Sequence, residues 1–201
     1  MKKKISDCCE GNALIVAYLE ILELRLKKGR FIHTLGVVET AAKMARHYGV
    51  DPVQVMTAAA LHDYAKNLSA NELLEFAENN EVPIDDIMKQ SAELLHGLVG
   101  AEMVRVAFAI DDQQVLDAIR YHTIGRKNMS EIEKIVYLAD AIEPGRDYPG
   151  LEVLRAIAFE DLDKGVFISV KETLSYVLEK GLSMHPNSVD LYNQLVVIGD
   201  Q

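Results

Sequence analysis

The chain has 201 residues, 49% of them hydrophobic and 26% charged, a balance that is typical of one globular domain with a sizeable core. Its formal net charge of −10 argues against general binding of DNA or RNA, which requires a basic face for phosphate neutralisation. No apolar run reaches the roughly 18 residues of a membrane-spanning helix, and no signal-peptide core follows the first lysines, so we expect a cytoplasmic protein without membrane contact.

The N-terminal stretch contains two adjacent cysteines, Cys8 and Cys9. Adjacent cysteines rarely close a disulfide of good geometry, so we interpret them as reduced thiols near a mobile N-terminus, with a redox or metal role as the minor alternative. From Asn12 onwards the apolar spacing predicts a helix. We expect one face of this helix to carry four apolar residues: Leu14, Tyr18, Leu22 and Leu26.

Capping signals mark the helices that follow. Gly49 ends the next periodic stretch as a left-handed cap, and Asp51 with Pro52 begins another helix through a capping carboxylate and a proline at the first helical position. Two further helix starts have the spacing of a capping box: Ser69 with Glu72, and Ser130 with Glu133. Residues 151–180 are predicted to be helical with at most one break, and Pro186 begins the last helix.

Helical spacing covers almost the whole chain, and the sequence contains neither an alternating strand pattern nor an internal repeat. The sequence therefore predicts an all-α bundle of roughly nine or ten helices. We assign residues 1–201 to one domain, in which an N-terminal helical segment, 1–27, packs on a core formed by residues 28–197.

Six ionisable residues lie in apolar helical stretches, where an unpaired charge is costly. In AAALHDYAK, residues 58–66, His62 and Asp63 directly follow three alanines and a leucine, although aspartate is almost never fully buried without a partner. The other four are His33, His96, His122 and Asp140. Each residue alone fits a structural role, but together they come from different helices that a bundle core can bring to one point.

Neighbouring features separate these residues from ordinary helix positions. Gly97 and Gly100 follow His96 on the same helix, where each glycine costs about 1 kcal/mol relative to alanine, so we expect another helix or a ligand to approach closely there. His47, in contrast, lies in the last turn of a helix, where the helix dipole favours a cation. We therefore leave His47 out of the candidate site.

The donor set indicates a metal centre. Imidazole and carboxylate groups suit Fe, Mn, Co or Zn, and no thiolate is needed. Six protein ligands are too many for one catalytic ion that must keep a coordination position open. Two ions that share a bridging carboxylate use the set more naturally.

Five stretches in order carry a family resemblance: RFIHTLGV, ALHDYAK, LLHGLVGAE, AIRYHTIGR and YLADAIEPGRDYPGLEVLR. They resemble the HD-domain metal-dependent phosphohydrolases and, among these, the YqeK-type branch of symmetrical diadenosine tetraphosphatases. The resemblance runs from about residue 28 to about residue 195 and keeps all six ligand positions. It implies that the helical bundle is an HD domain.

The resemblance further implies a pair of iron ions, one held by His33, His62, Asp63 and Asp140 and the other by Asp63, His96 and His122. Asp63 would then bridge the two ions. The implied reaction is hydrolysis of diadenosine tetraphosphate into two ADP molecules, through attack of a hydroxide that bridges the ions. The residue types alone do not separate iron from Mn, Co or Zn.

Several residues near the expected ligands are candidates for substrate binding. Lys66, one turn after His62, is the first candidate for stabilising phosphate charge, and Arg30 and Arg146 flank the other ligands. The alternative for each of these cations is a solvated surface charge. Pro186 opens a helix whose free N–H groups favour anions. Three more candidates for nucleotide contact are Thr123, His185 and Asn187.

Two other functions stay open. One is another HD-type hydrolase that acts on a nucleoside monophosphate or a cyclic dinucleotide, and the other is a nucleotide-binding module with a vestigial metal site. A purely structural helical adaptor is disfavoured, because a simple core would not tolerate six buried polar residues. The sequence does not determine the oligomeric state, for which a homodimer is one of the options.

Overall fold

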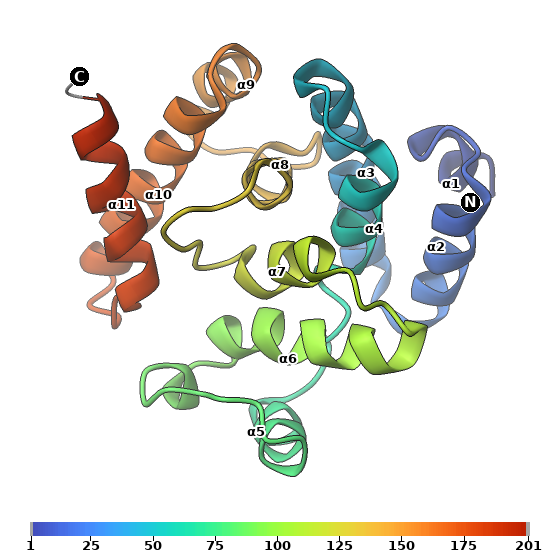
Figure 1. Cartoon of the computed structure of the whole chain (residues 1–201), viewed down its shortest axis with the longest axis horizontal. Coiled ribbons are helices and arrows are strands. Elements are labelled where there is room, and N and C mark those ends of the chain that lie inside the picture. The colour runs from blue at the N-terminus through green and yellow to red at the C-terminus, as the bar shows by residue number, and fades with distance from the viewer. Residues whose placement is uncertain (1, 200–201) are drawn as a thin grey trace.

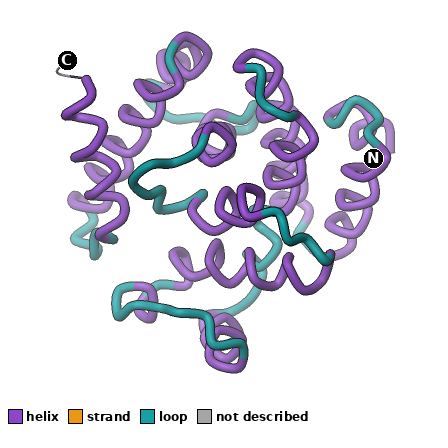
Figure 2. The backbone as a smooth tube through the Cα atoms, viewed as in Figure 1, coloured by secondary structure: helices purple, strands orange, loops and turns teal. Residues whose placement is uncertain are grey.

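Every regular element in residues 2–199, the part of the chain that this computed structural model describes, is a helix (Figure 1, Figure 2). The elements are α1 (Lys2–Cys8), α2 (Ala13–Arg25), α3 (Lys28–Tyr48), α4 (Pro52–Leu61), α5 (Ala70–Asn79), η1 (Met88–Gln90), α6 (Ala92–Phe108), α7 (Gln113–Tyr121), α8 (Glu131–Ile142), α9 (Leu151–Glu160), α10 (Leu162–Glu179) and α11 (Pro186–Gly199). The all-α prediction is confirmed. The helices outnumber the expected nine or ten because α1 precedes Asn12 and because Asp161 divides residues 151–180, where its carboxylate caps α10.

The centre of the fold is built by α3, α4, α7 and α8. Helix α3 packs against both α4 and α8, and α7 packs against α4, α6 and α8. The three alanines at positions 58–60 of α4 are fully buried, and such small side chains let neighbouring helices approach closely. The six expected metal ligands lie on or directly after these central helices and α6.

Two groups of helices flank this centre on opposite sides (Figure 1). Helices α9, α10 and α11 pack together beside α8, whereas α1 and α2 cover α3 and α4. Helix α5 and the short η1 turn pack on α6 and enclose a smaller apolar cluster of their own. None of the helices in the described part of the chain is long and apolar enough to span a membrane.

The predicted capping residues act as expected. Asp51 accepts hydrogen bonds from the backbone N–H groups of Val53 and Gln54 at the start of α4. Both predicted capping boxes form, at the starts of α5 and α8. Gly49 ends α3 in the left-handed conformation, with φ at 69°. These local signals are sufficient to place the ends of four helices.

The predicted face of α2 is right only in part: Leu22 and Leu26 are buried, but Leu14 is not. The structure buries Ile15, Leu19 and Leu22, and it leaves Leu14 47% exposed. Helix α2 is apolar on nearly all sides, so the spacing of its apolar residues did not distinguish the face that would be buried.

The predicted environment of the cysteine pair is also wrong. Both thiols are free, as expected, but they lie in the main apolar core because α1 packs back on α3. The Cys9 Sγ donates to the Ile5 carbonyl oxygen at 3.0 Å. Burial, together with the neighbouring Cys9, raises the pKa of Cys8 to about 12. A protonated, buried thiol is a poor nucleophile, so the redox alternative loses its basis.

Candidate metal centre

Six buried or half-buried donors converge from five segments of the bundle. His33 lies on α3, His62 and Asp63 directly follow α4, His96 lies on α6, His122 follows α7, and Asp140 lies on α8. Their donor atoms form three overlapping triplets, each with all atoms within 4.8 Å of one another: His33, His62 and Asp63; His62, His122 and Asp140; and Asp63, His96 and His122. The structure therefore brings together all six residues that the sequence singled out.

The end of α4 explains how two successive residues reach one point. Helix α4 ends at Leu61, and His62 keeps a right-handed helical backbone as its C-cap. The chain then tightens into turns, in which the Lys66 N–H donates to the Asp63 carbonyl oxygen at 2.9 Å. Because the regular helix has stopped, the side chains of His62 and Asp63 both face the cluster, with His62 Nε2 3.3 Å from Asp63 Oδ2.

The histidine rings are all held in the same tautomer. The Nδ1 atoms of His62, His96 and His122 each lie 2.7 Å from a backbone carbonyl oxygen three residues earlier. A carbonyl oxygen can only accept, so each of these Nδ1 atoms carries the proton. His33 Nδ1 lies 3.1 Å from the Glu143 carboxylate, which favours the same arrangement. With the proton on Nδ1, the Nε2 atom of each ring faces the cluster.

The Nε2 atoms lie close to one another and to carboxylate oxygens. His96 Nε2 and His122 Nε2 are 2.9 Å apart, and His33 Nε2 lies 3.0 Å from Asp140 Oδ1. Among the described residues, His33 Nε2 and His62 Nε2 are buried without a hydrogen-bond partner. Lewis bases that face one another at such distances repel unless a cation lies between them. The donor set, buried and short of protons, therefore fits divalent metal ions.

Asp63 occupies the middle of the cluster. Its Oδ2 atom faces His62 at 3.3 Å and His33 at 3.8 Å, while its Oδ1 atom faces His96 at 3.3 Å and His122 at 3.8 Å. One carboxylate oxygen thus faces one pair of imidazoles, and the other oxygen faces the second pair. This two-sided position is the geometry required of a carboxylate that bridges two ions.

The electrostatics keep the carboxylates ionised. Burial opposes the charge of Asp63, but the charge and hydrogen bond of His62 outweigh burial and hold the pKa of Asp63 well below its usual range. Burial likewise opposes the charge of Asp140, whose pKa is nevertheless lowered by His33 and by nearby cationic groups. Burial, with the neighbouring His96 and His62, lowers the pKa of His122 to about 3. Burial disfavours the charge of His62, but the neighbouring Asp63 outweighs burial and raises the pKa of His62. A metal ion would therefore take the place of a proton on His62, beside carboxylates that are already ionised.

Three predicted cations surround the cluster. Arg30 Nη1 donates to Asp63 Oδ2 at 2.9 Å, and Arg146 Nη2 donates to Asp140 Oδ1 at 2.5 Å. Lys66 forms an ion pair with the exposed Glu93. The side chains of Arg30 and Arg146 are about one-third exposed, at 33% and 37%, so they reach from the carboxylates to solvent. An anionic ligand that approaches from this side meets positive charge first.

The remaining predicted residues divide into two groups. The Thr123 hydroxyl lies at the cluster, 3.1 Å from His122 Nε2 and 3.4 Å from His96 Nε2. His185 and Asn187 line a different cleft of about 690 Å³, where His185 Nε2 pairs with Asp85 at 2.8 Å. None of the six converging residues is among the described residues that line this cleft.

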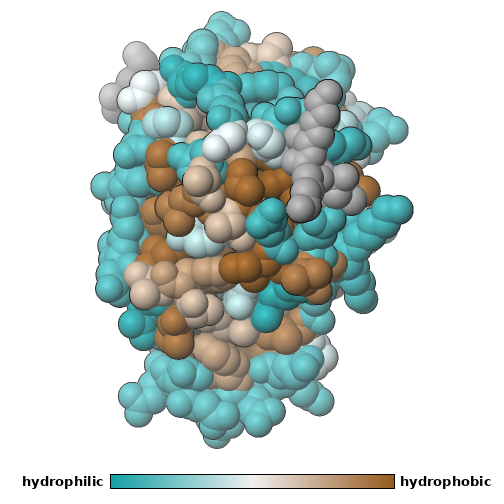
Figure 3. Space-filling view, turned by 90° about the vertical axis from the view of Figure 1, so that its right-hand side faces the viewer, coloured by the Kyte–Doolittle hydropathy of each residue, from teal (hydrophilic) through white to brown (hydrophobic). Residues whose placement is uncertain are grey.

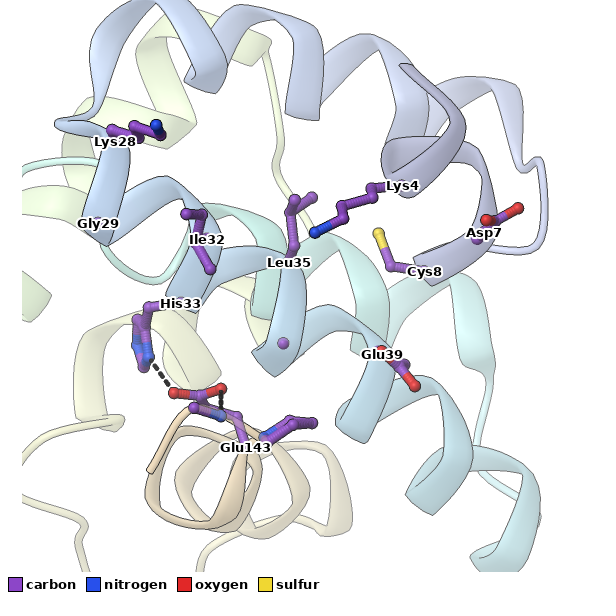
Figure 4. A pocket seen from close by; sticks show the side chains of 13 residues that line it. Lys4, Asp7, Cys8, Lys28, Gly29, Ile32, His33, Leu35, Glu39 and Glu143 are labelled. Carbon is purple, nitrogen blue, oxygen red and sulfur yellow. Dashed lines mark hydrogen bonds and ion pairs between the residues drawn. The ribbon is translucent and has the colours of Figure 1, made fainter. Parts of the chain in front are cut away.

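A second cleft, of about 740 Å³, touches the cluster at His33 (Figure 4). It lies between α1, α3 and the loop of residues 143–145. Figure 4 shows Lys4 reaching from α1 towards Leu35 and Ile32 of α3, with His33 and Glu143 on the opposite side. The cleft thus combines apolar side chains with charges of both signs, from two lysines and from the carboxylates of Asp7, Glu39 and Glu143.

Sequence reasoning missed Glu143, which positions His33. Its carboxylate is buried and accepts twice, from His33 Nδ1 at 3.1 Å and from the Gly145 N–H at 2.5 Å (Figure 4). A Cβ on Gly36 would collide with this carboxylate, so the glycine creates the space that the carboxylate fills. Arg155 holds the Glu143 carbonyl oxygen at 2.8 Å. The signal in the sequence is an acid directly after the Asp140 helix.

We expect Glu143→Gln to weaken binding of divalent metal by about 10–100-fold, the usual effect of losing a carboxylate behind a ligating histidine. Glutamine has one acceptor oxygen in place of two, so either His33 or Gly145 loses its partner. Competition with a chelator measures the affinity. Glu152→Gln is the matched control, because Glu152 is an exposed partner of Arg155 far less buried than Glu143. Equal affinities of the two variants would contradict the positioning role.

Comparison with known proteins gives a consistent set of relatives. Residues 30–145 match the HD domain family. The chain is 41% identical to a symmetrical bis(5′-nucleosyl)-tetraphosphatase of Halalkalibacterium halodurans, over 89% of this chain and 95% of that protein. It is 36% identical to the Bacillus subtilis protein of the same name, with the same coverage. A crystal structure of a predicted HD superfamily hydrolase involved in NAD metabolism, from Clostridium acetobutylicum, matches with a TM-score of 0.87 and 38% identity, over 90% of this chain and 96% of that one.

Proposed function

Since the chain belongs to the HD domain family and, within it, to the symmetrical bis(5′-nucleosyl)-tetraphosphatases, we propose that it hydrolyses diadenosine tetraphosphate at the middle of the phosphate chain and releases two ADP molecules. The observation that carries this proposal is the two-sided position of Asp63 between two pairs of imidazoles. It supports a pair of divalent ions, the arrangement that suits cleavage between two phosphates.

The six converging residues would hold the metals. His33, His62, Asp63 and Asp140 would hold one ion, and Asp63, His96 and His122 would hold the other. We expect iron, although Mn, Co and Zn also accept imidazole and carboxylate ligands. When bound, such ions polarise phosphoryl oxygens and lower the pKa of a water from 15.7 to about 7.

The surrounding residues would stabilise the negative charge of the substrate phosphates. The leaving group is a phosphate anion, so it requires cations more than a proton donor. Arg30 and Arg146 lie on the solvent side of the carboxylates, where they can bind phosphate oxygens. Lys66 could join them by exchanging its exposed partner Glu93 for a phosphate. The Thr123 hydroxyl is free to rotate and donate to an oxygen at the cluster.

The cleft beside His33 supplies room for one nucleoside of the substrate. Its volume of about 740 Å³ falls in the range of ligand pockets, about 300–1,000 Å³. Ile32 and Leu35 offer an apolar surface for the base, and Lys4 and Lys28 are cations of the same cleft (Figure 4). A nucleoside placed there would keep its phosphates close to His33.

The products of hydrolysis test the proposal. Protein purified without chelator or added metal is expected to contain about two metal equivalents per chain and to convert diadenosine tetraphosphate into ADP alone. In ¹⁸O-water, one of each two ADP molecules carries the label on its terminal phosphate. AMP with ATP, or release of inorganic phosphate, would instead identify another hydrolase of the same fold. Tight nucleotide binding without turnover would identify a binding module.

A further inference from the structure

One of the three cations around the metal centre has a partner that lies outside the donor cluster. Arg30 and Arg146 each pair with a carboxylate of the cluster. Lys66 instead pairs with Glu93, which belongs to none of the three donor triplets found among the described residues. A metal ion would hold the partners of both arginines in place. Glu93 is therefore the one carboxylate of these three pairs that can leave its cation.

Both members of the pair are tied to metal ligands through the backbone. The Lys66 N–H donates to the Asp63 carbonyl oxygen at 2.9 Å, and the Glu93 carbonyl oxygen accepts from His96 Nδ1 at 2.7 Å. The hydrogen bond from Lys66 holds the pKa of Glu93 below its ordinary value against partial burial, and the nearby His96 and Arg30 lower it further. The Glu93 carboxylate is therefore ionised and lies close to the groups that surround the metal centre.

The two side chains of the pair differ in their freedom to move. The Lys66 side chain is only 17% exposed, so its surroundings restrict it, whereas the Glu93 side chain is 76% exposed. An ion pair with an exposed member contributes little to stability, so Glu93 loses little when it swings into solvent. Lysine is a compact point charge with three rotatable donors, so a phosphate oxygen can replace the carboxylate oxygen without moving the ammonium. The carboxylate is the member of the pair that moves.

We propose that Glu93 occupies, in the free protein, the place beside Lys66 that a substrate phosphate takes, and that it must swing out before the phosphate chain binds. This inference rests on the proposed function, since it takes the ligand to be a nucleoside polyphosphate. A carboxylate tethered at the site competes at a high local concentration, so it weakens binding of the substrate and returns to Lys66 as ADP leaves. Glu93 thus acts as a built-in competitor that favours product release.

The overall charge of the chain makes this competition significant. The formal net charge is −10, so an anionic ligand gains no attraction at long range. The side of the molecule that carries α1 and α2 adds little attraction, because hydrophobic residues gather across its middle (Figure 3). Binding of a polyphosphate therefore depends on the metal ions and on the few cations beside them. Glu93 neutralises one of these cations.

Binding of ADP to the metal-loaded full chain, measured by isothermal titration calorimetry, tests the inference. We expect Glu93→Gln to bind ADP about two- to fivefold more tightly than the wild type, the fold-change that corresponds to the loss of one exposed ion pair. Glu102→Gln is the matched control, because Glu102 also lies on α6 and also pairs with a cation, Arg105, but farther along the helix. It removes the same charge and should leave the affinity for ADP unchanged. An unchanged affinity in Glu93→Gln, or the same gain in both variants, overturns the inference.

The same measurement in a Lys66→Met background tests the exchange itself. If Glu93 acts by occupying Lys66, adding Glu93→Gln no longer tightens ADP binding once the ammonium is gone. The same gain in this background would show that the carboxylate acts through general repulsion, and would overturn the exchange. A metal-loaded wild-type protein that binds no ADP would instead overturn the proposed function, and this inference with it.

Discussion

Replacing Asp63 by asparagine is expected to lower kcat for diadenosine tetraphosphate by about 10³-fold or more. Asp63 is the carboxylate whose two oxygens face the two imidazole pairs. An amide keeps the shape but has one oxygen and no charge, so it cannot neutralise two cations. Loss of metal stabilisation costs several kcal/mol of the barrier, and each 1.36 kcal/mol is tenfold in rate.

The measurement pairs turnover with metal content. We expect Asp63→Asn to retain fewer metal equivalents than the wild type, with an unchanged helical spectrum. Asp117→Asn is the matched control: Asp117 is also mostly buried and paired with arginines, Arg120 and Arg126, but it lies outside the cluster. It should keep its metal and its kcat. Wild-type turnover by Asp63→Asn would disprove the bridging role.

The site could be predicted because its evidence is local. A histidine and an aspartate that directly follow three alanines and a leucine are buried wherever that helix packs, and buried Lewis bases require a cation. Helix starts were predictable for the same reason, since a capping carboxylate or a capping box acts within one turn. Local chemistry thus identified all six converging residues and one end of each of four helices.

Features that depend on long-range packing were missed. Glu143 precedes a proline in a loop, a position at which the sequence predicts a solvent-exposed charge. In the structure Glu143 is buried, because Gly36 on α3, more than a hundred residues earlier, leaves space for its carboxylate. The cysteine pair lies in the core because α1 folds back on α3. For the helix that begins at Pro186, the start was correct, but the sequence did not indicate which cleft His185 would line.

Helix α2 also shows that a local sequence pattern does not determine long-range packing. Its sequence is apolar on nearly all sides, so periodicity predicts a helix without selecting its buried face. The buried face carries Ile15, Leu19 and Leu22, and packing against α3 and α4 selects it rather than the spacing within α2.

Gly97→Ala is expected to loosen the contact that orients His122, with loss of both stability and activity. A Cβ at this position would lie 2.9 Å from the Arg120 carbonyl oxygen and 3.2 Å from that of Ile119. Both are backbone atoms of α7, and the Ile119 carbonyl is the acceptor that fixes the tautomer of His122. Because backbone cannot swing aside, α6 and α7 must separate, which costs about 1–3 kcal/mol as overpacking usually does.

The same displacement moves His96 away from His122, and a misplacement of about 1 Å can cost roughly 10²-fold in rate. Gly100→Ala, three residues later on α6, is the internal control. Its Cβ would meet Ala65 at 3.5 Å, an ordinary contact, and alanine gains about 1 kcal/mol of helix propensity over glycine. The two variants should therefore differ in both thermal unfolding and kcat. Gly97→Ala should be less stable and slower than the wild type, whereas Gly100→Ala should be at least as stable and fully active. If the stability and kcat of both variants change in the same direction, helix propensity explains the effect of these substitutions and the close approach of α7 to Gly97 does not.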